Sequence, residues 1–80
     1  MDKDLAKLVA QTAFRSAADI NNLIPLLKEY CTEEECREFG IAIATASSGI
    51  SQQIMGKVFA LHPDLEAEFE SQIRKYGRPI

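Results

Sequence analysis

Residues 36–61, CREFGIAIATASSGISQQIMGKVFAL, carry two stripes of side chains at helical spacing. Each stripe steps by three or four residues, which stacks side chains on one side of a helix. The first stripe comprises Cys36, Gly40, Ile43, Ser47, Ile50, Ile54, Val58 and Leu61. The second comprises Ile41, Thr45, Ser48, Gln52, Met55 and Phe59. Because a surface helix of a small monomer needs only one such stripe, we expect this helix to be covered on two sides.

The limits of this helix are marked on both sides. Thr32 and Glu35 have the spacing of a capping box, and Pro63 forces an end at the residue before it. Gly49 offers an alternative end, after which Ser51 would cap a new helix. Since the first stripe keeps its phase across Gly49, we predict one long helix, with a bend allowed at Ser48–Gly49.

Three further helices complete the prediction, over residues 3–20, 23–30 and 63–76. Asp2 or Asp4 would cap the first, Asn22 the second, and Pro63 and Gly77 mark the two ends of the last. The first is predicted to bury Leu5, Leu8, Val9, Ala13, Ser16, Ala17 and Ile20, and to leave Phe14 exposed as a lone ring. The second would bury Leu23, Leu26, Leu27 and Tyr30, and the last Leu65, Phe69, Tyr76 and either Ile73 or Gln72.

The fold class is therefore all-α: one compact domain, residues 1–80, with four helices, or five if the long one breaks at Gly49. A helix over residues 32–61 would be about 45 Å long. A compact globule of this chain length has a diameter of roughly 30 Å. Ile41, Met55 and Phe59 would then stay exposed to solvent unless a second chain covers them. The second stripe is accordingly the predicted interface of a homodimer, with the small Thr45 and Ser48 allowing two helices to cross closely.

Cys31 and Cys36 form the one candidate chemical site. They occupy the N′ and N4 positions of a hydrophobic staple, where two side chains meet across a helix start. A Cα separation of about 5–6 Å would also suit a disulfide, so a thiol redox pair is the alternative. The neighbouring Glu33, Glu34 and Glu35 oppose thiolate formation and favour the staple.

Other chemistry has little support in the sequence. C-x₄-C is not a usual zinc spacing and His62 is the single histidine, so no metal and no cofactor is expected. Ser47–Ser51 lacks the lysine and the strand of a phosphate-binding loop. A net charge of −3 argues against nucleic-acid binding. We expect no membrane span and no secretory signal, and hence a cytoplasmic location that suits two free cysteines.

These observations predict a non-enzymatic interaction or regulatory module that acts as a homodimer. Its partners would be a second copy of itself and, through the same stripe, a larger protein. Phe14 and the acidic residues 33–38 are secondary candidates for partner contact. Two alternatives stay open: a thiol-based redox sensor using Cys31 and Cys36, and a carrier of a small ligand in a pocket between helices.

Overall fold

The computed structural model describes every residue, 1–80, and contains helices with no strand, which confirms the all-α class. The elements in chain order are α1 (Lys3–Asn21), α2 (Ile24–Tyr30), α3 (Glu33–Gly49), the π-helical η1 (Ile50–Met55), α4 (Gly56–Leu61) and α5 (Pro63–Tyr76). No non-helical residue separates α3, η1 and α4, so the long helix is continuous across Gly49 as predicted.

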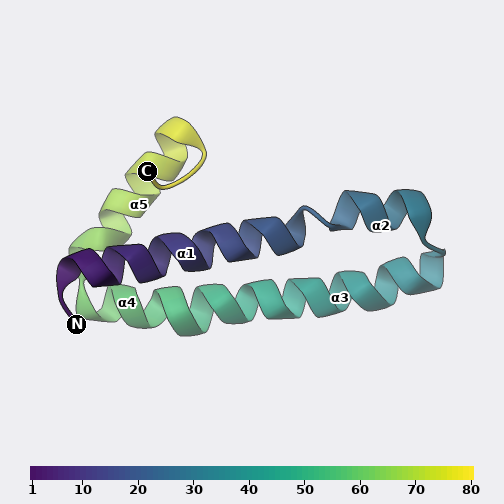
Figure 1. Ribbon diagram of the computed structural model, residues 1–80, viewed down its shortest axis with the longest axis horizontal. Coiled ribbons are helices and arrows are strands. Elements are labelled where there is room, and N and C mark those ends of the chain that lie inside the picture. The colour runs from purple at the N-terminus through teal and green to yellow at the C-terminus, as the bar shows by residue number, and fades with distance from the viewer.

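The chain folds into a long helical hairpin. The rod formed by α3, η1 and α4 runs antiparallel beside α1, and α2 extends the line of α1 before the chain turns back (Figure 1). α5 leaves the opposite end of the rod. The extents are 45 × 24 × 15 Å and the radius of gyration is 14.6 Å, against about 12 Å for a compact chain of this length. The predicted compact shape is therefore wrong.

Local capping fixes the helix ends much as the sequence predicts. The Asp2 carboxylate accepts a hydrogen bond from the Leu5 N–H at the start of α1 (2.9 Å). At the start of α3, the Glu35 N–H donates to the Thr32 hydroxyl (3.2 Å), and the Thr32 N–H donates to the Glu35 carboxylate (3.0 Å). α5 starts at Pro63 and ends before Gly77, whose φ of 77° lies in the left-handed region that favours glycine.

The π-helical segment changes the orientation of the long helix's side chains. The Gly56 N–H donates to the Ser51 carbonyl five residues back, where an α-helix would bond four residues back. Each such turn holds one extra residue, so the side chains after it no longer follow the phase set in α3. The uniform helical spacing assumed for the two stripes therefore fails between Ile50 and Met55.

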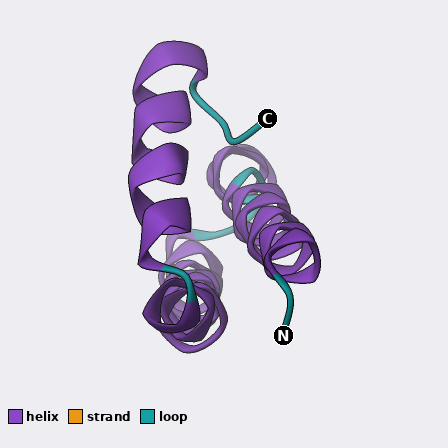
Figure 2. Cartoon of the chain, turned by 90° about the vertical axis from the view of Figure 1, so that its left-hand side faces the viewer, coloured by secondary structure: helices purple, strands orange, loops and turns teal.

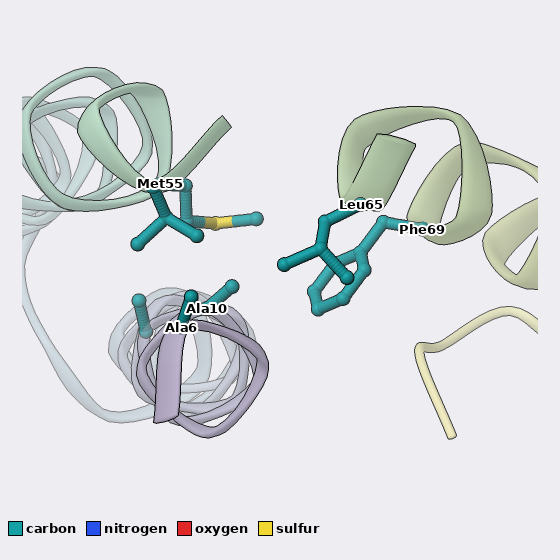
Figure 3. Packing of buried hydrophobic residues seen from close by; sticks show 7 residues of the cluster. Ala6, Ala10, Met55, Leu65 and Phe69 are labelled. Atoms are coloured by element: carbon teal, nitrogen blue, oxygen red, sulfur yellow. The ribbon is translucent and has the colours of Figure 1, made fainter. Parts of the chain in front are cut away.

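All of the buried residues belong to one cluster. The cluster contains Ala6, Ala10, Ala13, Met55, Val58, Leu65 and Phe69. Met55 points from the long rod towards the alanines of α1, while Leu65 and Phe69 enter the same space from α5 (Figure 3). We call residues 1–13 and 50–80, which hold this cluster, the α5 end, and residues 14–49 the α2 end. The core thus sits entirely at the α5 end.

The buried face of α1 agrees with the predicted one at Ala13 and otherwise differs from it. It is the line of small residues Ala6, Ala10 and Ala13, whereas Leu5 and Leu8 are 47% and 55% exposed. Alanines let the two rods approach closely, and this close contact turns the leucines outwards. Phe14, predicted as an exposed ring, is half-buried and packs against the core cluster.

α2 is also more exposed than predicted. It has no buried residue, and Leu23, Leu26 and Tyr30 are about half exposed or more. Its N-cap is Leu23, which makes no side-chain capping bond, while Asn22 ends α1 instead. In α5, likewise, Tyr76 is exposed, and only Leu65 and Phe69 are buried. Because α2 is short and packs against a single neighbouring helix, its second side stays exposed to solvent.

Candidate interaction surfaces

The predicted interface stripe is divided by the structure. Ile41, Thr45, Ser48 and Gln52 are exposed, and Ile41 is 63% accessible. Met55 is buried at 9% exposure, and Phe59 is half-buried against the ring of Phe69, with the centroids 5.5 Å apart in an edge-to-face arrangement. The chain's own α5 side of the core therefore encloses Met55 and covers part of Phe59, and the rest of the predicted stripe stays exposed.

α5 is held on this side of the hairpin by charges as well as by apolar packing. Lys3 pairs with Asp64, and the Lys7 ammonium lies 3.0 Å from the Glu68 carboxylate. The hydrogen bond from Lys3 lowers the pKa of Asp64, and the same bond raises the pKa of Lys3. Figure 2 shows α5 standing beside the two rods on one side only. The other side of the hairpin carries no helix of this chain.

That uncovered side is hollowed by two adjoining grooves between α1 and the long rod. Both grooves include Val9 and Ile54, so they form one continuous depression. Its lining comprises Met1, Leu8, Val9, Thr12, Ala13, Ser16, Ile50, Gln53, Ile54, Lys57, Val58 and Leu61. Lys57 has the only charged side chain among these. A surface almost free of charge and lined by aliphatic side chains resembles the centre of a protein–protein interface.

The same side of the long rod continues towards α2. The Ile50 N–H donates to the Ala46 carbonyl, so Ala46 lies one turn before Ile50. Ala42 and Phe39 precede Ala46 by four and seven residues and so share its side of α3. Phe39 is 53% exposed, and Ala42 and Ala46 are exposed. We call the grooves together with Leu5, Phe39, Ala42 and Ala46 the open face.

Cys31 and Cys36 lie together as free thiols at the turn between α2 and α3. The Cys36 thiol lies 2.9 Å from the Leu27 carbonyl and 3.9 Å from the Cys31 carbonyl. Both side chains are half-buried, as in a staple. Desolvation, followed by the charge of Glu35, raises the pKa of Cys31 and opposes formation of its thiolate.

Further chemical features are few. No three His, Cys, Asp or Glu side chains gather as a metal site, and no helix is long and apolar enough to cross a membrane. A third hollow lies between α1 and the residues after α5, and Arg15 and Arg78 line it. Comparison with protein-family models, curated proteins and solved structures gives no match.

The open face contains residues that the sequence analysis assigned to the interior. Leucine and valine carry the strongest apolar signal, so the spacing predicts that Leu5, Leu8 and Val9 are buried. Val9 is half-buried against the core, whereas Leu5 and Leu8 are exposed. The signal that points to the correct face is weaker: Ala6, Ala10, Ala13 and Ala17 recur at spacings of four and three residues. Such a line of small residues is typical of a close helix contact.

Proposed function

We propose that the protein is a non-enzymatic, cytoplasmic interaction module built as a homodimer of four-helix chains, with a larger protein as a further partner. Its function would consist of contacts between helices, with no catalytic step. The raised pKa of Cys31 makes the thiol-sensor alternative less favourable.

The observation that carries the proposal is the amount of surface left uncovered. The chain exposes 5758 Å², whereas a compact monomer of 8.9 kDa exposes about 4,800 Å². The surplus of roughly 900–1,000 Å² is close to the ~800 Å² that each partner buries in a standard interface.

The exposed residues have the chemistry that such an interface needs. Among them are several large apolar side chains that a monomer would leave in water: Met1, Leu5, Leu8, Leu26, Phe39, Ile41, Ile54 and Leu61. Burying one of this size contributes about 1.5–3 kcal/mol. A few of them, doubled by a two-fold axis, suffice to hold a dimer together.

Light scattering coupled to size exclusion tests the proposal on the unmodified chain. At micromolar concentration we expect a mass twice the 8.9 kDa of one chain. A mass of one chain across the accessible range of concentration would contradict the proposed dimer. A reducing agent in the buffer separates non-covalent association from cross-linking through Cys31 or Cys36.

A further inference from the structure

We infer that the open face, and not the predicted stripe around Ile41, is the surface on which two copies of this chain pair. The inference rests on the proposed dimer and adds which residues form it and how the copies are oriented. The two rods of one chain would pack on the two rods of the other, which gives a bundle whose core is the pair of open faces.

The first argument is position. α5 covers one side of the hairpin through Leu65 and Phe69, and the ion pairs to Lys3 and Lys7 fix it there. A second copy can therefore reach both rods along their whole length only from the other side. Ile41 and Thr45 lie on the part of α3 turned away from α1, where only one rod could be touched. Contact with both rods buries more area than contact with one.

The second argument is shape. At the α5 end the open face carries bulky side chains, namely Leu5, Leu8, Ile54 and Leu61, and towards its middle it carries the small Ser16 and Ala46. A two-fold axis that lies between the two open faces, perpendicular to the long axis of the hairpin, places α1 over α1 and the long rod over the long rod in opposite directions. The bulky part of each copy then lies over the small part of the other. Large residues against small ones fill space efficiently in a helical core. The face is thus complementary to an inverted copy of itself.

The third argument is charge. The two grooves contain a single charged side chain, that of Lys57, at their α5 end. The side that holds α5 carries Lys3, Lys7, Asp64 and Glu68. Since charged groups are depleted at the centre of interfaces and costly to bury unpaired, the open face is the side suited to desolvation.

A matched pair of substitutions tests the assignment. Ile54→Glu places a carboxylate on the open face, and Ile41→Glu makes the same change on the opposite part of α3; the two isoleucines are 43% and 63% exposed. We expect Ile54→Glu to weaken the dimer by more than about 100-fold, because each copy buries an unpaired charge, and Ile41→Glu to leave it unchanged. Leu8→Glu, at a more exposed site of the same face, should act like Ile54→Glu and is less prone to disturb the folded chain.

Sedimentation equilibrium supplies the readout, with circular dichroism to confirm that each variant stays helical. If the natural chain dimerises but Ile41→Glu dissociates it, or neither groove variant does, the assignment of the face is overturned while the proposed function stands. If the natural chain is monomeric, the proposed function itself fails.

Cysteine cross-linking tests the orientation independently. In a Cys31→Ser, Cys36→Ser background, Leu8→Cys combined with Ser16→Cys should form a covalent dimer on mild oxidation, because the inverted arrangement places α1 over α1 and brings the bulky Leu8 of one copy over the small Ser16 of the other. The two single variants are the controls and should cross-link far less. Equal cross-linking of a single variant, or none of the double variant, would refute the inverted orientation.

Discussion

The two ends of this hairpin are stabilised in different ways. The α5 end holds all seven buried residues, because a third helix crosses the two rods there. The α2 end has two helices side by side, and neither α2 nor α3 contains a buried residue. It is held by polar contacts such as Asn21 Nδ2 to Ser47 Oγ (3.0 Å) and by half-buried side chains such as Leu27 and Ile43. An 80-residue chain thus completes one core, and the other half of the hairpin has no core of its own.

The largest difference in stability between substitutions at the two ends should come from Phe69→Ala. The ring is 2% exposed and packs edge-on against Phe59, so its removal leaves a cavity in the only core. We expect a loss of about 3–5 kcal/mol in the free energy of unfolding, measured by urea denaturation. Tyr30→Ala at the α2 end removes a ring that is 77% exposed and should change stability by less than about 0.5 kcal/mol. Equal losses would show that the core is not confined to the α5 end.

A smaller loss of stability should follow from placing a larger side chain in the close contact between the rods. Ala10 is fully buried, and Ala10→Leu would force α1 away from the long rod. The expected cost is about 1–3 kcal/mol in the same denaturation experiment. Ala44→Leu is the matched control, because Ala44 is exposed on α3 and leucine is nearly as good a helix former as alanine. A tolerated Ala10→Leu would mean that the rods do not meet closely along the alanine line.

Removing the cap of α3 should cost less again. Thr32→Ala eliminates the hydroxyl that accepts from the Glu35 N–H, at a cost of about 1 kcal/mol. The same change should raise the pKa of Glu35 only part of the way to its ordinary value, because the larger lowering comes from the backbone N–H of residue 32, which alanine keeps, and only the hydroxyl's hydrogen bond is lost. Hydrogen exchange in the first turn of α3 and an NMR titration of Glu35 provide the measurements. Thr45→Ala, in the middle of α3, is the control and should leave both observables unchanged.

The smallest expected effect concerns the exposed Lys3–Asp64 pair that helps to hold α5. The pKa of Asp64 is lowered, so its contribution is present above the ordinary value of 3.8 and lost as the pH falls through the lower, folded value. The pKa of Lys3 is raised, so its contribution is present below 10.5 and lost as the pH rises through the higher, folded value. The pair therefore acts only between these limits. The difference in urea midpoint between the natural chain and Asp64→Asn should vanish in strong acid, and a difference that persists there would not come from the pair.

The parts of the fold that the sequence predicts correctly rest on local interactions. The Thr32–Glu35 capping box, the Asp2 cap and the Pro63 and Gly77 boundaries each depend on a few neighbouring residues. Continuity across Gly49 also rests on a local property, because a glycine within a helix is tolerated, whereas the phase of the stripe changes in the π-helical segment that follows. The partner of the Thr32 hydroxyl is three residues away in the chain, so this hydrogen bond does not depend on the tertiary fold.

The parts that were wrong depend on contacts between distant segments. The α5 helix folds back onto Met55 and Phe59, and no spacing rule reveals which stripe a following helix will cover. The π-helical turn at Ile50–Met55 then shifts the phase on which the stripe assignment relied. In α1, the stronger hydrophobicity of Leu5 and Leu8 favours burying the leucines, but close packing of two rods favours the smallest side chains, which are the alanines. The candidate interface therefore moved from one side of the long helix to the other.

Hydrogen exchange at two protein concentrations tests most directly whether the α2 end depends on a second copy. At a concentration where the mass is doubled, the account predicts slow exchange of the α3 amides and of α1 beyond Ala13. On dilution below the dissociation constant, most of the dimer dissociates, and the exchange rate of these amides should rise in proportion to the fraction of monomer. Amides beside Ala10, Val58 and Phe69 should stay protected at both concentrations. Protection of α3 that is the same at every concentration would contradict the account.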